Sequence, residues 1–464
     1  MENLVVRLSS VTLKNIKNVK NGTVFMPLSK KKVSSVGGAE VLGIYGQNGS
    51  GKTAIVDALF FLQKIMMGLS IEASMSDYIG TDDDSAYMNL EFKMFAREKV
   101  YEVGYHIVIK KSDDTVVIER EYLNCSISQG GKRTNKNIFM DYNRTDTEGI
   151  FKPQKRLDEL VDKRKERITD LIVARKLAEK SNCSFIFGEA SREIFCQEKE
   201  GPFKEYSTVI RALFEFSLKD LFVIRNTHSG MITAKFLLPM AFRIEKNQIG
   251  AKGDFPISLT EPVVLDIEKK NLLDEIIEQI NTVLYTIIPG MNISVKDYGK
   301  QVLDSGEEGW KVELMSVRDG KKPIPIRMES EGIIKIISIL NVLILAFGNP
   351  SVCLVIDELD AGIFEYMLGE LLDIFEKSAK GQLIFTSHNL RALEMLDKSS
   401  IMFSTVNPQN RYIHMKSVKE SNNLRSMYIR SITLGGQDED IYEETDSLKI
   451  ARAFRKAGRS LHEE

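Results

Sequence analysis

The sequence predicts an α/β fold in which buried parallel strands carry a phosphate-binding loop. A strand-like run at 41–45 enters a glycine-rich loop, and a helical pattern begins at Thr53. Two further apolar runs, at 353–358 and 382–389, end in polar residues. Strands buried on both faces read as continuous apolar runs, and parallel sheets present functional side chains at their carboxyl ends. The three runs therefore predict one sheet edge that carries a site.

The loop reads GQNGSGKT over residues 46–53 and fits the pattern G-x-x-x-x-G-K-[ST]. Glycines let successive N–H groups point at phosphate oxygens, and the helix N-terminus adds its positive end. We expect Lys52 to reach the β- and γ-phosphates and the Thr53 hydroxyl to ligate Mg²⁺. A plain glycine turn is the alternative, which the strand–loop–helix context disfavours. The residues expected to bind ATP are Gly46, Asn48, Gly49, Ser50, Gly51, Lys52 and Thr53.

The two later runs supply candidate catalytic residues. The run at 353–358 ends in Asp357 and Glu358. Asp357 is placed to hold Mg²⁺, directly or through water, and Glu358 is the residue expected to polarise the attacking water. The run at 382–389 ends in a polar cluster that contains His388. A lone histidine is more typical of a capping or structural role. Its position after the two acids favours a hydrogen bond to the γ-phosphate.

Residues 329–332, ESEG, open an apolar helix expected from Ile333 to Phe347. Ser330 suits the N-cap of that helix, so ordinary helix capping explains it. The functional alternative is a second phosphate-binding helix end. The residues by themselves leave both interpretations open.

Composition limits the class of protein. The chain has 464 residues, which predicts two or three domains, and its formal net charge is −2, so any nucleic-acid contact needs a local basic patch. Its 4 cysteines lack C-x-x-C spacing, which argues against a zinc site and fits a reducing compartment. The longest apolar stretch, 332–347, is interrupted by polar residues and too short to span a bilayer. We expect a cytoplasmic protein without a membrane partner.

The remaining segments predict a two-part domain with an insertion. Two strands are expected within 3–28, with a turn at 17–22, and an antiparallel meander is expected over 86–125. Composition shifts near 126, and helices are expected at 153–180, 203–221 and 266–287, followed by strands at 291–298 and 310–317. We therefore predict an N-terminal half at 1–125, a mainly helical insertion at 126–290, a C-terminal half at 291–405 and a C-terminal segment at 406–464.

The helix expected at 153–180 has an apolar stripe and a strongly charged face. Its interspersed acids favour a solvated face with i,i+4 pairs, and the alternative is a patch for nucleic acid or a partner protein. The cations of that face are Lys155, Arg156, Lys163, Arg164, Lys165, Arg167, Arg175 and Lys176.

Together these motifs resemble the ABC-type P-loop ATPase heads of the RecF/SMC/Rad50 group. The resemblance covers about 3–125 and 290–405. Residues 46–53 resemble the Walker A loop, 354–358 Walker B with its catalytic glutamate, 359–361 the D-loop, and His388 the switch histidine. Residues 329–333 resemble a degenerate signature motif in which Ser330 and Gly332 match the serine and the second glycine. The opening residues 13–18 resemble the first strand of that group.

The resemblance implies a Mg²⁺-dependent ATPase whose catalytic residues are Lys52, Glu358 and His388. It also implies that Ser330, Gly332 and Asp360 contact nucleotide, and that a second copy of the chain completes each ATP site. The signature lacks its leucine, first glycine and final glutamine, and Gln63 lies too close to Walker A to be the Q-loop residue. An ABC transporter ATPase is disfavoured by the degenerate signature and by the long separation of Lys52 from Asp357.

A weaker resemblance, carried by DELDAGIFEYMLGE at 357–370 and by TSHN, is to OLD-like and PARIS-type phage-defence ATPases. Those ATPases work with a TOPRIM nuclease, for which the residues after His388 are too few. The expected partners are therefore a second copy, a separate nuclease effector and a viral trigger protein. The alternative is a DNA-repair or chromosome-maintenance ATPase of the RecF kind that binds DNA. A third hypothesis is a pseudo-ATPase, in which bound nucleotide has only a structural role.

Overall fold

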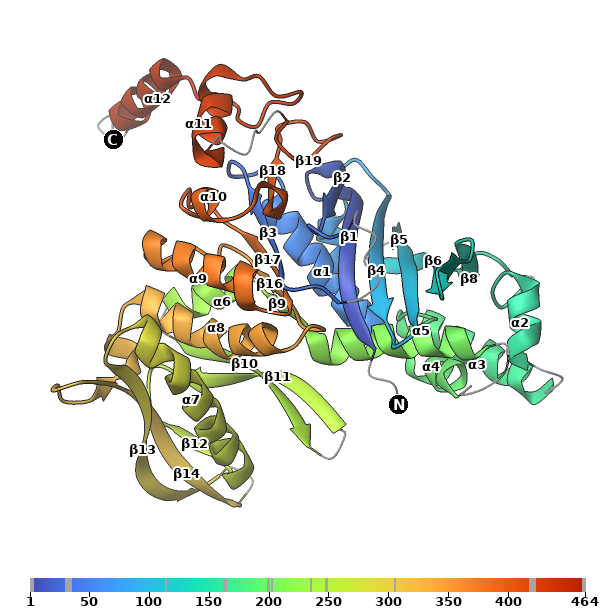
Figure 1. The fold of residues 1–464 in the computed structure, drawn as a ribbon, viewed down its shortest axis with the longest axis horizontal. Helices are drawn as coiled ribbons and strands as arrows, with labels where there is room; N and C mark the ends of the chain where they lie inside the picture. The colour runs from blue at the N-terminus through green and yellow to red at the C-terminus, as the bar shows by residue number, and fades with distance from the viewer. Residues whose placement is uncertain are drawn as a thin grey trace.

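The computed structural model describes residues 4–29, 36–112, 115–147, 149–161, 165–197, 201, 203–233, 236–246, 249–303, 306–416 and 423–460. Its centre is a six-stranded sheet with the order β19-β18-β3-β17-β16-β9 (Figure 1). All neighbours in this sheet run parallel except β18 and β19. The strands are β3 (Glu40–Tyr45), β9 (Leu221–Ile224), β16 (Cys353–Ile356), β17 (Gln382–Thr386), β18 (Ile401–Ser404) and β19 (Tyr412–Ile413).

The central sheet is buried on both faces, which explains its continuous apolar strands. On one face, Leu42 and Ile44 pack with helix α1 (Lys52–Met66) and the antiparallel sheet. On the other, Val41 and Tyr45 pack with helices α8 (Glu331–Gly348) and α9 (Glu365–Ser378). Successive side chains of a strand point to opposite faces, so each short strand contributes to two cores.

A second sheet is antiparallel and confirms the expected meander. Its order is β2-β1-β4-β5-β6-β7, and β8 also pairs with β6. The fold class is therefore confirmed as α/β with an antiparallel β subdomain. The strands are β1 (Val5–Ile16), β2 (Val19–Phe25), β4 (Ser85–Phe95), β5 (Lys99–Ser112), β6 (Thr115–Gln129), β7 (Lys132–Arg133) and β8 (Asn137–Asn143).

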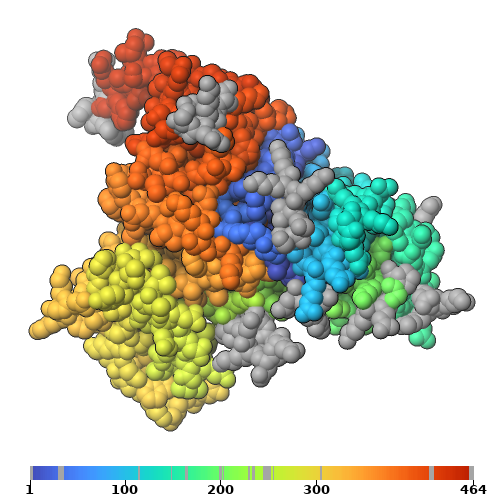
Figure 2. Space-filling view, in the orientation of Figure 1, coloured from blue at the N-terminus to red at the C-terminus, as the bar shows by residue number. Residues whose placement is uncertain are grey.

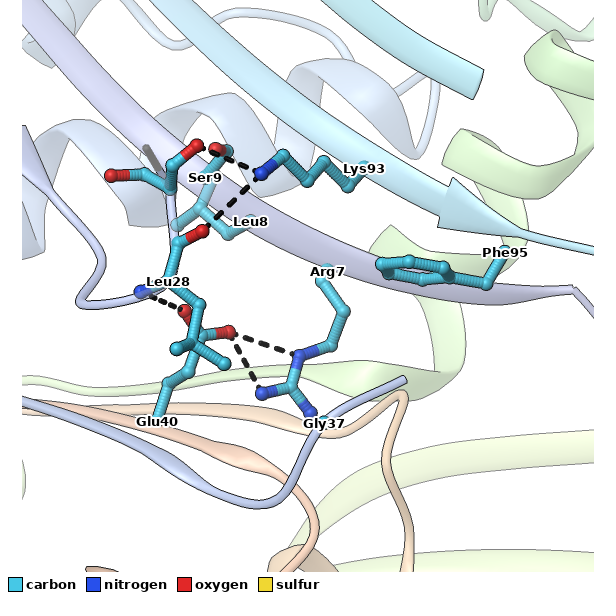
Figure 3. A pocket seen from close by; sticks show the side chains of 9 residues that line it. Arg7, Leu8, Ser9, Leu28, Gly37, Glu40, Lys93 and Phe95 are labelled. Carbon is cyan, nitrogen blue, oxygen red and sulfur yellow. Dashed lines mark hydrogen bonds and ion pairs between the residues drawn. The ribbon is translucent and has the colours of Figure 1, made fainter. Parts of the chain in front are cut away.

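A buried ion pair joins the two sheets. Arg7 of β1 donates to the carboxylate of Glu40 at the start of β3, at 2.8 Å from Nη2 to Oε2, and both side chains are 5% exposed (Figure 3). Arg7 also donates to the carbonyls of Lys380 and Gly38. Lys93 crosses from β4 to the carbonyls of Leu28 and Ser29 beside this pair. The small pocket in Figure 3 is thus a structural junction.

A third core surrounds α7 (Ile267–Ile287), whose N-cap Asp266 accepts from the Lys269 amide. It contains the hairpin of β13 (Met291–Val302) and β14 (Glu308–Arg318), to which β12 (Val263–Leu265) and β15 (Ile324–Pro325) pair. Helix α8 contributes to this core and to the one above the central sheet. By length and composition α8 is apolar enough to cross a membrane, but 67% of it is buried inside the protein.

The region 126–290 is less helical and less separate than the sequence predicts. Strand β9 lies inside it and pairs in parallel with β16 of the central sheet. A second strand pair, β10 (Leu237–Lys246) with β11 (Ile249–Ser258), also lies there. The helix expected to reach 221 ends earlier, because α5 (Lys204–Glu215) passes through one π-helical turn into β9. Four apolar residues at a helix end have no periodicity that separates strand from helix.

The helix expected at 153–180 is two helices, α2 (Gln154–Val161) and α3 (Lys165–Ser181). Residues 162–164, which include Arg164, lie outside the described residues, and the description does not extend to the Lys165 side chain. Arg156 pairs with Glu159, Arg167 donates to the Leu160 carbonyl, and Arg175 pairs with Glu179. Each of these cations is engaged within the chain, which favours the structural interpretation of the charged face.

Helix α3 nevertheless exposes apolar residues. Ile168, Ile172, Val173 and Leu177 are each 39–49% exposed, whereas Leu171 is buried. Helix α4 (Glu189–Cys196) packs beside it. The other short helical elements are α6 (Asn226–Thr233), α10 (Ala392–Met395) and the 3-10 turns at Ala73–Tyr78, Ile326–Met328 and Lys398–Ser400.

The C-terminal segment forms two helices, α11 (Leu424–Leu434) and α12 (Ser447–Ser460). In Figure 2 this segment makes one end of the molecule, and the regions around α3 and around the β13–β14 hairpin project elsewhere from the centre. The central sheet therefore lies where these parts meet. Its carboxyl edge, where the parallel strands end, is the expected position of the site.

Candidate nucleotide site

The phosphate loop connects β3 to α1 and has the backbone that its glycines predict. Gly49 and Gly51 have φ values of 78° and 90°, and Gly46 has φ 152°. These conformations are open to glycine and strained for residues with a Cβ. At Gly46 a Cβ would also lie 2.0 Å from the Ser404 hydroxyl. The glycines are thus required both for the turn and for close packing against β18.

Several loop carbonyls accept hydrogen bonds from side chains of the chain itself. The Lys52 ammonium donates to the carbonyls of Gly46 and Gln47, each at 2.9 Å. Tyr412 donates its hydroxyl proton to the Gly51 carbonyl at 2.6 Å, and the Asn18 amide donates to the Gly49 carbonyl. With these carbonyls engaged, loop amides and the first N–H groups of α1 remain as donors for an anion. This arrangement fits the triphosphate of ATP.

Lys52 is the cation of this concavity and is 7% exposed. Burial lowers the pKa of its ammonium, and the nearby carboxylates of Asp357, Glu358 and Asp360 act in the opposite direction. A buried ammonium is stabilised when it donates a charge-assisted hydrogen bond to a negatively charged phosphate oxygen. Lys52 is therefore suited to neutralise bound phosphate.

The donors for Mg²⁺ meet at the ends of α1 and β16. The Thr53 hydroxyl lies 3.4 Å from Oδ1 of Asp357, and Asp357 is 2% exposed. Mg²⁺ is usually held by one or two protein oxygens together with phosphate oxygens and waters. Among the described residues no cluster of three His, Cys, Asp or Glu ligands occurs. Thr53 and Asp357 thus fit an ion that is shared with the nucleotide and stabilises its phosphate charge.

Thr386, at the end of β17, organises the two acids. Its hydroxyl donates to Oδ1 of Asp357 at 2.6 Å and accepts the Glu358 amide at 2.7 Å. Its carbonyl accepts the Leu359 amide at 3.0 Å. Glu358 itself has φ 48°, in the left-handed region that is uncommon for residues other than glycine. This turn separates a buried Asp357 from a partly exposed Glu358.

His388 follows the same strand and is connected to the D-loop-like turn. Its backbone amide donates to Oδ2 of Asp360 at 3.0 Å, while Oδ1 of Asp360 is buried and has no hydrogen-bond partner among the described residues. Burial lowers the pKa of the His388 imidazole, and the charge of Lys52 lowers it further. The carboxylates of Asp360, Glu358 and Asp357 act against this shift. A histidine ring has an N–H to donate, as a contact with a γ-phosphate requires.

Ser330 is the N-cap of α8 in extended conformation, and its side chain makes no capping hydrogen bond. Ser330 is exposed, whereas Gly332 is buried against the turn after β16. A Cβ at Gly332 would lie 1.9 Å from the Gly362 carbonyl oxygen. The helix end therefore has an open hydroxyl and packs on the D-loop-like turn of the same chain.

Sequence reasoning missed several residues of this site. Thr386 belongs to TSHN and Asn18 to the stretch 13–18, but neither residue was assigned a role in the site. Tyr412 belongs to the segment at 406–464 that the resemblance does not cover. Two further contacts reach the loop from beyond residue 400: Ser404 bonds to Ser50, and the Glu443 amide donates to the Gln47 side chain at 2.9 Å.

Gln63 makes its hydrogen bonds away from the phosphate loop. It is buried in α1, and its amide donates to the carbonyl of Leu221 at the start of β9. Strand β9 ends at the same sheet edge as β16, because the Asp357 amide donates to the Ile224 carbonyl at 2.9 Å. Arg225, the next residue, pairs with the buried Asp57 of α1 at 2.9 Å. The residues after β9 therefore lie at the same edge of the central sheet as the candidate site. The sequence analysis did not predict this position.

Tyr412→Phe is expected to raise the dissociation constant for ATP about fivefold, the scale of one net hydrogen bond. The variant removes the donor that holds the Gly51 carbonyl away from the phosphates. Titration of a fluorescent ATP analogue measures the change. Tyr142→Phe is the matched control, since the Tyr142 hydroxyl bonds to Glu179 at 3.2 Å, away from the loop. Equal affinities for both variants would contradict the role of Tyr412.

The fold and the order of these motifs define an ABC-type P-loop ATPase. Four features share the carboxyl edge of the central sheet and follow one another along the chain. They are the phosphate loop, the polar N-terminus of α8, the strand that ends in two acids, and the strand that is followed by His388. Residues 7–391 match the family described as AAA ATPase domain. The chain belongs to this family and is an ATPase, which confirms the expected activity.

The solved structures that match this chain include SMC head domains and a RecF protein. An SMC head domain from Thermotoga maritima is 14% identical with a TM-score of 0.36, and the match covers 88% of this chain and 99% of that one. An Smc head from Pyrococcus furiosus, bound to the C-terminal domain of ScpA, is 13% identical with a TM-score of 0.36 and coverages of 88% and 96%. The recombination mediator RecF with ATP is 12% identical with a TM-score of 0.33 and coverages of 83% and 94%. No curated protein matches significantly.

Proposed function

We propose that this ATPase is a nucleotide-driven switch whose active site is shared between two copies of the chain. ATP with Mg²⁺ is held by the phosphate loop, Thr53 and Asp357. Glu358 orients the attacking water, and His388 donates to the γ-phosphate. Such a site works by positioning and by charge stabilisation, because little covalent chemistry is required of the protein.

The observation that carries the shared site is the open N-terminus of α8. Ser330 is exposed without a capping bond, at a helix end that can bind an anion. Exposed apolar side chains lie in the adjoining segments, with Met328 and Phe364 each 67% exposed and Tyr366 51% exposed. Phe364 and Tyr366 also contact each other, with ring centroids 5.7 Å apart, and exposed apolar groups of this kind are typical of an interaction surface. A second copy that brings its own phosphate loop to this face would cover both.

The biological setting we favour is antiviral defence, with the ATPase as sensor and scaffold in the cytoplasm. A separate TOPRIM-type nuclease would be the effector, and a viral protein the trigger. The support for this is the sequence resemblance carried by 357–370 and by TSHN. The RecF-like alternative is a DNA-binding repair or chromosome-maintenance ATPase. The exposed apolar residues of α3 are a candidate surface for either kind of partner.

The test compares ATP turnover by the purified chain with Mg²⁺, with and without double-stranded DNA. Turnover that DNA leaves unchanged, together with protection from phage that requires an adjacent nuclease gene, supports the defence role. Stimulation by DNA of tenfold or more supports the repair role instead. A chain that binds ATP without turnover under either condition would have lost the catalytic part of the proposal.

A further inference from the structure

Helix α8 carries a buried lysine that the reaction as described does not use. Lys335 is 4% exposed and lies one turn beyond Gly332. Its ammonium donates to the backbone carbonyl of Glu358, which is its one hydrogen bond among the described residues. Burial of an ammonium is costly unless its charge is compensated, so this residue calls for an explanation.

The compensating charges lie in the turn that follows β16. Burial lowers the pKa of the Lys335 ammonium to about 8, and Asp360, Glu358 and Asp357 act against this shift. Lys335 makes no ion pair within 4.0 Å among the described residues. The ammonium therefore faces three acids at longer range and fixes its position through one carbonyl. Its contact is directed at the backbone of Glu358 rather than at a carboxylate.

That backbone needs to be held. Glu358 has φ 48°, a conformation that costs energy in a residue with a Cβ. The Thr386 hydroxyl accepts a hydrogen bond from the Glu358 backbone N–H, and the Lys335 ammonium donates one to the Glu358 carbonyl. With both flanking peptide groups anchored, the direction in which the Glu358 side chain leaves the turn is set.

Lys335 also joins this turn to the helix end that we assign to the partner's nucleotide. Gly332 packs directly on Gly362 four residues beyond Glu358, where even a methyl group would clash. The start of α8 and residues 358–362 are thus connected by one hydrogen bond and one close backbone contact. A displacement at the helix end would be transmitted to Glu358.

We propose that Lys335 is a positioning residue for ATP hydrolysis, whose ammonium holds the Glu358 carbonyl and so orients the Glu358 carboxylate. Lys335 touches neither nucleotide nor metal in this role. The inference rests on the proposed function of Glu358. It adds the residue that holds the Glu358 backbone in its left-handed conformation. An ordinary buried lysine would affect stability and leave the chemical step unchanged.

Lys335→Met tests this directly, because methionine fills the same space without a charge or a donor. We expect kcat to fall by about tenfold to hundredfold, the scale for a misplaced catalytic group. The dissociation constant for ATP should stay within about threefold, since the phosphate loop is untouched. Lys335→Arg should recover most of kcat, because it restores a charged donor. Single-turnover hydrolysis and ATP titration supply the two readouts.

Asn341→Leu is the matched control on the same helix. Asn341 is 3% exposed and its amide donates to the Ala241 carbonyl at 3.0 Å, so this variant also removes a buried bond from α8 to backbone. We expect it to lower thermal stability and to keep kcat. If Lys335→Met does not fold, Lys335→Gln, which retains a neutral donor, takes its place with a smaller expected loss of kcat.

The outcomes separate this inference from the proposal beneath it. Wild-type kcat in Lys335→Met, while Glu358→Gln is slow, overturns the role of Lys335 alone. A loss that appears in ATP affinity rather than kcat, or an equal loss of kcat in Asn341→Leu, also overturns it. Wild-type turnover in Glu358→Gln would instead remove the proposed role of Glu358.

Discussion

Glu358→Gln is expected to bind ATP with wild-type affinity and to hydrolyse it on the order of 10²-fold or more slowly. The amide keeps the shape of the side chain, and the Thr386 and Lys335 bonds to the Glu358 backbone remain available. What is lost is the carboxylate that accepts a proton from water. ATP titration and steady-state phosphate release measure the two effects separately.

Lys52→Ala is the contrasting variant. It removes the buried ammonium beside the phosphate loop, so we expect ATP affinity itself to fall by about tenfold or more, the scale of a charge-assisted hydrogen bond.

If Glu358→Gln turns over ATP like the wild type, the assignment of Glu358 is wrong.

Ser330→Arg is expected to abolish most ATP hydrolysis while each chain still binds nucleotide at its own phosphate loop. The arginine would place bulk at the exposed N-terminus of α8, where we expect the γ-phosphate of a second copy. In a two-fold pair each chain gives one helix end and receives one, so a single substitution damages both sites. Light scattering with ATP should show a weakened pair, and ATP titration an unchanged site within the chain.

Mixing the two variants tests the shared site. A pair made of one Ser330→Arg chain and one Glu358→Gln chain contains one site in which both residues are wild type and one that is doubly defective. Partial recovery of hydrolysis on mixing is therefore expected. No recovery in pairs whose formation has been verified, with Ser330 remote from every γ-phosphate in a nucleotide-bound structure, would exclude the model.

The sequence by itself determined the fold class and the parts of the site that have local signatures. The glycine loop at 46–53 needs positive φ values and close packing, which only glycines supply, so its pattern is readable in one short stretch. The acids after β16 and the histidine after β17 follow continuous apolar strands, because those strands are buried on both faces. The alternation in β4, β5 and β6 similarly predicted the antiparallel sheet.

Only the tertiary structure decided which distant residues complete this edge. Strand β9 has four residues and follows a helix without a break, so its place beside β16 depends on pairing rather than on periodicity. Tyr412 and Lys335 each donate a hydrogen bond to a backbone carbonyl more than twenty positions away in sequence. A hydrogen bond to a carbonyl requires no particular residue at the acceptor, so such contacts leave no pattern along the chain, and the packing of the sheets and of α8 brings them together.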